Sequence, residues 1–214
     1  PKKYKLHDYA WSNLSVSDIF EHIMDNQKVT EPFCFTFWYD CRRDKDTSKH
    51  VKRAIDKIKE KGYYDNSIII MHSDHGYPDP ASKLNEEFFK NIGHDMILTD
   101  DNIKVPFFLK YPGCPQNIKI KNNIGLIDVI PTIFDILELP YKRINDKYQG
   151  KSLLPIIAGK EVQDDRIRRT DTRLFADKGK VTSLRTNKFK YIYFVDEDYE
   201  ILYDLVNDKK EYKN

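Results

Sequence analysis

The sequence has no long apolar run and almost no net charge. Its apolar stretches at 67–71 and 126–139 are short or interrupted, well below the roughly 20 residues that a membrane-spanning helix needs, so we expect no membrane span. The 36 Lys and Arg nearly balance the 34 Asp and Glu, which leaves a formal net charge of +2. This balance excludes a polybasic surface spread over the chain, and we expect no nucleic-acid partner.

Cysteine is also scarce. Cys34, Cys41 and Cys114 are odd in number and none belongs to a C-x-x-C pair, which argues against a structural zinc site or a disulfide framework. Cys34 lies in an apolar run and is expected as a small buried side chain rather than a nucleophile. This usage favours a reducing compartment such as the cytoplasm. A signal peptide upstream of Pro1 is compatible with it, so the localisation stays open.

Apolar and aromatic residues are plentiful enough for a folded core. Hydrophobic residues make up 40% of the 214 residues, and 14 Tyr, 12 Phe and 2 Trp are among them. This composition excludes a disordered chain, and the length predicts one or two domains.

The first 140 residues alternate between strand and helix patterns. A short helix is expected to begin near Ser15 or Ser17, the two candidate caps. An aromatic run at 33–39 predicts a strand, and apolar residues recur at helical spacing over 48–61 before Gly62, a typical helix end. The continuously apolar run 67–71 predicts a strand buried on both faces. Strand, helix and buried strand together predict a βαβ unit of a parallel sheet.

The remaining chain predicts one more strand and helix, then antiparallel hairpins. The strand is expected at 105–110, and the helix at 128–137 with Asp128 as cap and Pro131 in its first turn. Short alternating runs follow at 181–185, 189–194 and 199–205. We therefore predict an α/β domain over 1–145, and a linker followed by a small antiparallel β subdomain over 146–214.

Polar side chains follow the apolar strand at 67–71. Ligands gather at the carboxyl ends of strands in open parallel sheets, and Asp74 and His75 emerge there with Gly76 behind them. A carboxylate beside an imidazole suits a divalent cation, although such pairs also cap helices. His94 and Lys104 are further polar candidates, although on the sequence alone a solvated side chain is the favoured interpretation of each. The carboxylate pair at 100–101 is likewise compatible with a solvated turn.

Short motifs succeed one another along the chain. They are GYYDNSIII at 62–70, SDHG at 73–76, GH at 93–94, KVPFFL at 104–109, YPG at 111–113, DVIPT at 128–132 and QGKSLLP at 149–155. In this order and spacing they resemble the sulfatase family, which belongs to the alkaline-phosphatase superfamily of metal-dependent ester hydrolases. The resemblance implies an α/β fold with a mostly parallel sheet flanked by helices and a small C-terminal antiparallel subdomain.

The resemblance also implies roles for individual residues. Asp74 and His75 would ligate one divalent cation, expected to be calcium, with magnesium, manganese and zinc as alternatives because His75 offers nitrogen rather than oxygen. His94 would contact the sulfuryl or phosphoryl oxygens, or the leaving oxygen, as a donor or general acid. Arg42 or Arg43 would contact the anionic sulfate- or phosphate-ester substrate in place of a histidine that the family carries in this loop and this sequence lacks. Lys104 is a further candidate for such a contact from its charge alone.

Three family elements are not found: the nucleophile motif, an upstream Asp-Asp metal pair and an Asp-x-His-x-Pro stretch after the strand at 33–39. The family's nucleophile is the first residue of Cys/Ser-x-Pro-x-Arg, and residues 41–45 lack its Pro and Arg. We therefore expect the nucleophile upstream of this sequence, in a metal-dependent hydrolase of sulfuric esters. The alternatives are a phosphoester or phosphonate hydrolase or phospho-group transferase of the same superfamily, and a non-catalytic sulfatase-like binding protein. The oligomeric state stays open.

Overall fold

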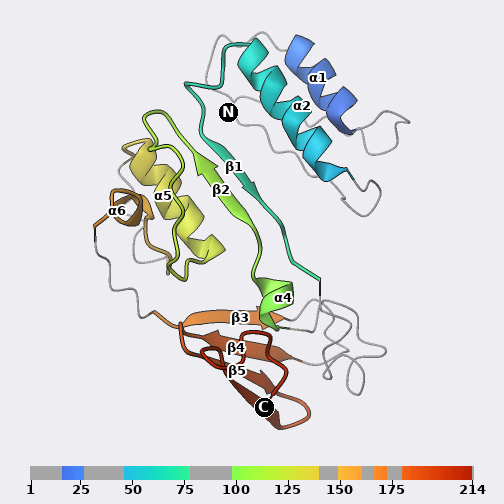
Figure 1. The fold of residues 1–214 in the computed structure, drawn as a ribbon, viewed down its shortest axis with the longest axis vertical. Coiled ribbons are helices and arrows are strands. Elements are labelled where there is room, and N and C mark those ends of the chain that lie inside the picture. Colours follow the sequence, from blue (N-terminus) through green and yellow to red (C-terminus); the bar gives the residue numbers. More distant parts are fainter. Residues whose placement is uncertain are drawn as a thin grey trace, which may run out of the picture. The chain divides into compact units, whose positions relative to one another are not determined.

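The computed structural model describes residues 16–26, 46–77, 98–139, 149–160, 166–172 and 180–213 (Figure 1). The chain divides into two compact units, residues 1–67 and 68–214, which are described separately. The domain boundary predicted near residue 145 lies inside the second unit and stays a prediction. The aromatic run at 33–39 lies outside the described residues.

The first unit contains two packed helices, α1 (Val16–Asn26) and α2 (Thr47–Glu60), as the sequence predicts. The Asp46 side chain caps α2 by accepting a hydrogen bond from the Lys49 N–H at 3.2 Å. Ser17 is not a cap, because α1 begins one residue earlier. Ser17 is buried instead, with its Oγ 2.7 Å from Nδ1 of His50 on α2.

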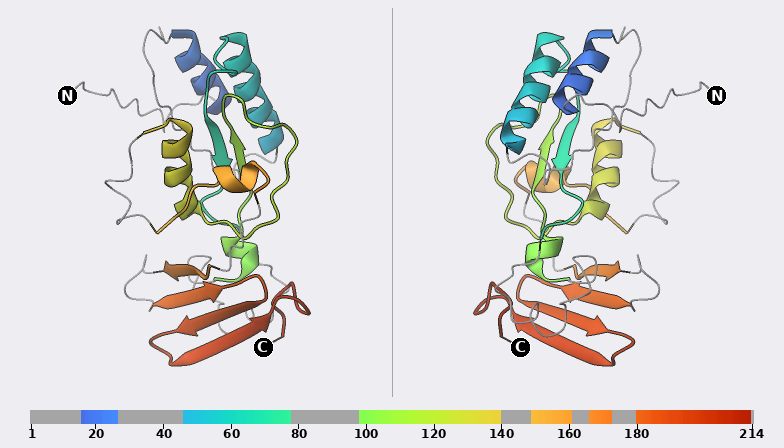
Figure 2. Two further views of the ribbon diagram at one scale, coloured as in Figure 1. Left: turned by 90° about the vertical axis from the view of Figure 1, so that its left-hand side faces the viewer. Right: turned by 90° about the vertical axis from the view of Figure 1, so that its right-hand side faces the viewer.

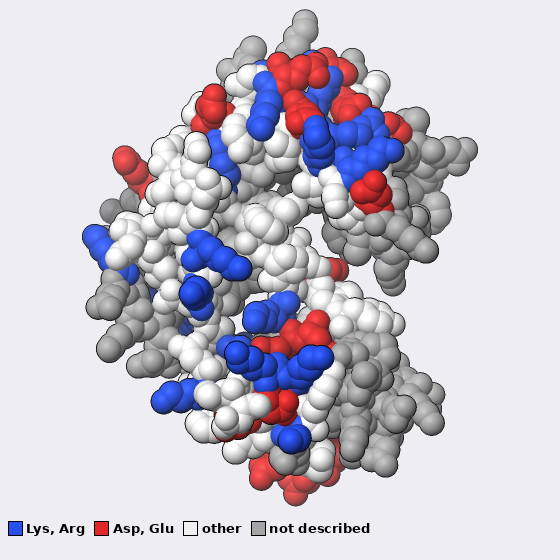
Figure 3. Space-filling model, viewed as in Figure 1, with Lys and Arg blue, Asp and Glu red and all other residues white. Residues whose placement is uncertain are grey.

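Ion pairs join the two helices. Arg53 donates to Glu21 and Asp18 at 2.8–2.9 Å, and both Lys57 and Lys61 contact Asp25. Acidic and basic side chains are interspersed over this helix pair on the face shown in Figure 3. We call these residues the helix-pair network: Arg53, Lys57, Lys61, Asp18, Glu21 and Asp25.

In the second unit, strands β1 (Ile69–His72) and β2 (Phe107–Lys110) form an antiparallel pair, with Ile69 opposite Lys110. The sequence predicted parallel strands here, and that prediction is wrong for this pair. A parallel neighbour requires a crossover to the other end of the sheet. The chain instead returns to β2 from the end at which β1 stops, because Gly76 after β1 contacts Asn102 shortly before β2.

The prediction that β1 is buried on both faces is also wrong for the described part of the chain. Ile69 and Ile70 are half-buried, but Met71 is 38% exposed, and its partner Phe108 is 58% exposed. A continuous apolar run reports that the side chains favour burial, and it does not supply the layers that cover them.

A short helical stretch follows β2. A 3₁₀ turn, η2 (Leu126–Asp128), leads directly into helix α5 (Val129–Ile136), and the short helix α6 (Leu154–Ile157) contacts α5. Pro131 lies in the first turn of α5, as expected from a residue that needs no N–H partner there. The helix predicted at 128–137 is confirmed to within a residue at each end.

The C-terminal sheet is a four-stranded antiparallel meander (Figure 2). Its strands are β3 (Arg168–Thr172), β4 (Val181–Arg185), β5 (Phe189–Phe194) and β6 (Tyr199–Asp204). The three predicted hairpin strands are confirmed. β3 was not predicted, because its sequence RRTDT carries the charge typical of edge strands rather than an apolar alternation.

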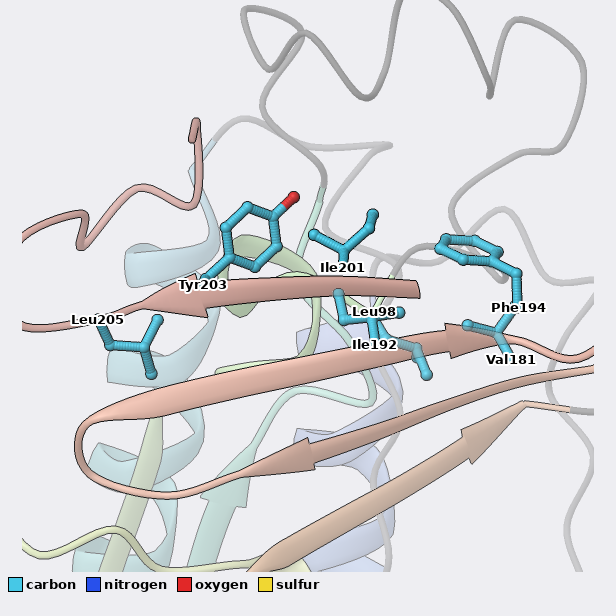
Figure 4. Close-up of a cluster of buried hydrophobic side chains, with 7 residues drawn as sticks. All are labelled: Leu98, Val181, Ile192, Phe194, Ile201, Tyr203 and Leu205. Atoms are coloured by element: carbon cyan, nitrogen blue, oxygen red, sulfur yellow. The ribbon is translucent and has the colours of Figure 1, made fainter. Parts of the chain in front are cut away.

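One face of this sheet carries an apolar core (Figure 4). Residues two apart along β5 and β6, Ile192 with Phe194 and Ile201 with Tyr203, point to this face, as the period of a strand requires. Leu98 packs into the same cluster, and it lies just before the short helix α4 (Asp100–Ile103). The core therefore ties the segment that leads into α4 to the C-terminal sheet.

No helix in the described ranges is long and apolar enough to cross a membrane.

Candidate functional site

The turn after β1 brings Asp74 and His75 together. Oδ2 of Asp74 lies 3.9 Å from Nε2 of His75, and the two side chains are 57% and 41% exposed. The His75 backbone N–H donates to Oδ1 of Asp74 at 3.0 Å, and Ser73 Oγ donates to the His75 carbonyl at 2.6 Å. The turn is thus held by its own polar groups, with the carboxylate and the imidazole presented to solvent.

The tautomer of His75 follows from its neighbour. Nδ1 lies 2.5 Å from the carbonyl oxygen of Gly76. A carbonyl oxygen only accepts, so Nδ1 carries the proton and the lone pair sits on Nε2. Histidine ligands of metals are commonly oriented by this kind of hydrogen bond.

Gly76 allows the turn to approach α4 closely. Its N–H donates to the Asn102 carbonyl at 2.5 Å, and the Tyr77 N–H donates to the Asp101 carbonyl at 3.1 Å. A Cβ at position 76 would lie 2.1 Å from the Asp101 oxygen, which is backbone and cannot swing away. Only glycine fits this position.

The pair suits one divalent cation on geometric and electrostatic grounds. Two ligands at about 2.0–2.6 Å from one cation lie within about 5 Å of each other, and Oδ2 and Nε2 satisfy that limit. Burial raises the pKa of Asp74, but hydrogen bonds to its carboxylate, chiefly from the His75 N–H, outweigh it, so the pKa lies below its ordinary value. Within the described ranges, no group of three or more His, Cys, Asp or Glu gathers around a possible metal position.

The other predicted site residues have different outcomes. Arg42, Arg43 and His94 lie outside the described residues, so their roles stay predictions. Lys104 is described: it ends α4, its N–H donates to the Asp100 carbonyl at 2.9 Å, and its side chain is exposed. Its contact with substrate also stays a prediction.

Of the carboxylate pair at 100–101, Asp101 is exposed, but Asp100 is not solvated. Both residues belong to α4, and the Asp100 side chain is 14% exposed and contacts Arg185 and Lys190 of the C-terminal sheet. Burial raises the pKa of Asp100, but the hydrogen bonds and charges of Arg185 and Lys190 outweigh it and lower that pKa to about 2. Sequence reasoning missed this role because the partners lie more than 80 residues away in the chain.

Asp128 has a structural role that the sequence reveals only in part. Asp128 occupies the N-cap position of α5, as predicted, but its side chain makes no capping hydrogen bond to that helix. Its fully buried carboxylate instead accepts from the Gly125 N–H at the start of η2. It also accepts from the Lys151 N–H at 2.8 Å and from Arg166 at 3.0 Å. Gly150 permits this approach, because a Cβ there would lie 1.9 Å from the Ile127 carbonyl oxygen.

Comparison with known families identifies the chain. Residues 44–139 match the sulfatase family model, and residues 94–214, more than half of the chain, match the model described as N-sulphoglucosamine sulphohydrolase, C-terminal. The chain belongs to the sulfatase family. The resemblance drawn from the motifs is thereby confirmed.

Individual relatives agree with this assignment. This sulfatase-family chain is 25% identical to arylsulfatase K of Canis lupus familiaris over 166 residues, which are 73% of this chain and 29% of the relative. The solved structure of BT1596, described as a 2-O GAG sulfatase, matches with a TM-score of 0.61 at 21% identity, over 78% of this chain and 35% of that one. The phosphonate monoester hydrolase SpPMH from Silicibacter pomeroyi matches with a TM-score of 0.57 at 24% identity, over 78% and 34%.

The structural likeness confirms the alkaline-phosphatase-like fold class predicted from the sequence, including the small C-terminal antiparallel sheet. The chain spans about a third or less of the length of these three relatives.

Proposed function

We propose that the protein is a metal-dependent hydrolase of sulfuric esters, in which Asp74 and His75 hold one divalent cation. The observation that carries the proposal is the exposed pair at the end of β1, with Oδ2 and Nε2 3.9 Å apart. Membership of the sulfatase family supports the sulfuric ester as the substrate class.

The chain's own residues have definable tasks in this proposal. Asp74 is a carboxylate at neutral pH, as an aspartate ordinarily is, so it offers negative charge to a cation without first losing a proton. His75 offers Nε2 because its Nδ1 proton is held by the Gly76 carbonyl. A bound cation supplies stabilisation of the charge that develops on an ester oxygen. Calcium is the first candidate, with magnesium, manganese and zinc as alternatives.

The remaining tasks fall to residues whose roles stay predictions from the sequence. His94 would donate to the sulfuryl oxygens or the leaving oxygen, and three basic residues would contact the anionic substrate: Arg42, Arg43 and Lys104. The nucleophile is expected in a Cys/Ser-x-Pro-x-Arg motif upstream of Pro1.

The test is turnover of an aryl sulfate by the complete protein. We expect activity that EDTA removes and that a divalent cation restores. Asp74→Ala should lower the rate about a hundredfold or more, because a catalytic metal supplies several kcal/mol to the transition state. Asp196→Ala, an exposed turn carboxylate between β5 and β6, is the matched control and should leave the rate unchanged. Metal-independent turnover, or full activity in Asp74→Ala, contradicts the proposal.

A phosphoester or phosphonate hydrolase is the second candidate. The similarity of the fold to that of the phosphonate monoester hydrolase SpPMH supports this second candidate. Comparing aryl phosphate and aryl phosphonate esters with the aryl sulfate separates the two activities, since the first candidate requires the sulfate to be the faster substrate. A protein that binds the cation but hydrolyses none of the three esters would instead be a sulfatase-like binding protein.

A further inference from the structure

A buried cluster of charges joins α4 to the C-terminal sheet. Arg185 donates from both Nε and Nη2 to the Asp100 carboxylate at 2.8 Å, and Lys190 donates to Oδ1 of Asp100 at 2.7 Å. Glu211 accepts from the Asp100 N–H at 2.6 Å and lies 3.1 Å from the Lys190 Nζ. We call these four residues the Asp100 network: Asp100, Arg185, Lys190 and Glu211.

The position of Lys190 makes this network costly to disturb. Lys190 is fully buried, on the same face of β5 as Ile192 and Phe194 and opposite Tyr203 of β6. A lysine on the core face has no water to solvate it, so its charge depends on Asp100 and Glu211. Burial raises the pKa of Glu211, whereas the hydrogen bonds and charges of Arg185 and Lys190 lower that of Asp100. The network therefore fixes α4 against the sheet.

The backbone of α4 carries this constraint to the turn after β1. Asp101 and Asn102 directly follow Asp100, and their carbonyl oxygens accept the N–H groups of Tyr77 and Gly76. The backbone of Gly76 lies so close to α4 that a methyl group on its Cα would collide with the Asp101 oxygen. A displacement of α4 must therefore displace the turn that carries Asp74 and His75.

We propose that the Asp100 network is a positioning device by which the C-terminal sheet sets the geometry of the Asp74–His75 pair through α4. The four residues act through the backbone and do not themselves touch cation or substrate. The inference rests on the proposed function for its consequence, the affinity for the cation. The coupling between the Asp100 network and the turn after β1 can be measured without any metal.

The experiment measures two quantities in the full chain. The first is amide hydrogen exchange at Gly76 and Tyr77 without metal, and the second is the affinity for Mn²⁺ by calorimetric titration. Lys190→Met removes the buried charge while keeping an unbranched side chain of similar length. Arg185→Gln is the milder break, because the Arg185 side chain is 18% exposed. Arg169→Gln is the matched control, since the Arg169–Asp171 ion pair belongs to the same sheet and is exposed.

We expect exchange at the two amides to accelerate about tenfold in Lys190→Met or, should that variant not fold, in Arg185→Gln. The affinity for Mn²⁺ should weaken about tenfold in the same variant, as it does when groups that orient metal ligands are lost. Arg169→Gln should change neither quantity. A purely structural network would lower the melting temperature and leave exchange at Gly76 and Tyr77 in the folded state as in the unaltered chain.

The two proposals fail separately. Unchanged exchange at Gly76 and Tyr77 in both variants overturns the positioning role, whatever the chain binds. Accelerated exchange with unchanged Mn²⁺ affinity also overturns it, because the turn would then move without affecting the cation. An unaltered chain that binds no divalent cation while its variants show accelerated exchange contradicts the proposed metal site and leaves the coupling between network and turn supported.

Discussion

The helix-pair network and the Asp100 network use the same side-chain chemistry in opposite surroundings. In the first, Arg53 is 33% exposed and its partners Asp18 and Glu21 are 43% and 32% exposed. In the second, Lys190 is fully buried and Glu211 nearly so. Water screens an exposed pair and can replace either partner, whereas a buried charge that loses its partner has nothing else to contact. The difference predicts that only the second network controls the geometry around it.

The largest loss of stability is expected from a substitution in the buried Asp100 network. Lys190→Met should lower the free energy of unfolding by about 3 kcal/mol, because it removes the buried cation that contacts both Asp100 and Glu211. Urea denaturation followed by far-UV circular dichroism measures this change. A loss below 1 kcal/mol would place the two networks in the same class and remove the basis of the comparison.

Next in size is the close approach of Gly76 to α4. Gly76→Ala should cost about 2 kcal/mol, since the added Cβ would lie 2.1 Å from a backbone oxygen and force α4 and the turn apart. Gly125→Ala is the matched control, because a Cβ there would meet its nearest atom at an ordinary 3.4 Å. Equal melting temperatures for the two variants would show that the contact between the turn and α4 has room to adjust.

A substitution in the exposed helix-pair network should lower the stability only slightly. Arg53→Met is expected to lower the free energy of unfolding by about 1 kcal/mol or less, even though Arg53 contacts both Glu21 and Asp18. Urea denaturation beside Lys190→Met gives the comparison directly. A loss as large as that of Lys190→Met would mean that exposure does not distinguish the networks.

The smallest effect is a difference in salt dependence at acid pH. Hydrogen bonds from Lys57 and Lys61 lower the pKa of Asp25 to about 2, and the Asp100 pKa is lowered to about 2 as well. A carboxyl whose folded pKa is depressed stabilises the fold above its unfolded pKa near 3.8, and that stability is lost as the pH falls toward 2. High salt should suppress the part due to the exposed Asp25 and spare the part due to Asp100.

Thermal melts between pH 4 and pH 2 at low and high salt measure this contrast. Asp25→Asn should remove a pH dependence that is visible only at low salt, and Asp100→Asn one that persists at high salt. Salt dependence of the same size at both positions would contradict the assignment of Asp100 to a low-dielectric environment.

The sequence predicted local features better than pairings. Helix α2, the ends of β4 and β5 and the turn with Asp74 and His75 follow from periodicity, caps and short motifs, which are encoded in neighbouring residues. The antiparallel pairing of β1 with β2 depends on where the chain re-enters the sheet, which no local pattern records. The Asp100 network escaped prediction for the same reason, because Asp100 and Lys190 are 90 positions apart.

The exposure of individual side chains could not be predicted from local sequence patterns either. The run at 67–71 was predicted to be buried because it is apolar, yet Met71 is exposed within the described structure. Lys190 shows the converse. A charged residue in a strand of alternating pattern is expected to face solvent, but Lys190 lies on the core face of β5. In both cases the outcome depends on which other elements cover the strand.

The metal content of the protein tests most directly whether Asp74 and His75 form a cation site. Elemental analysis by mass spectrometry of the purified full chain, after equilibration with a divalent cation and removal of the excess, should find about one ion per chain. The same treatment should leave Asp74→Ala without a stoichiometric ion, because a single protein ligand binds a cation too weakly to survive removal of the excess. An unchanged metal content in Asp74→Ala would contradict the account.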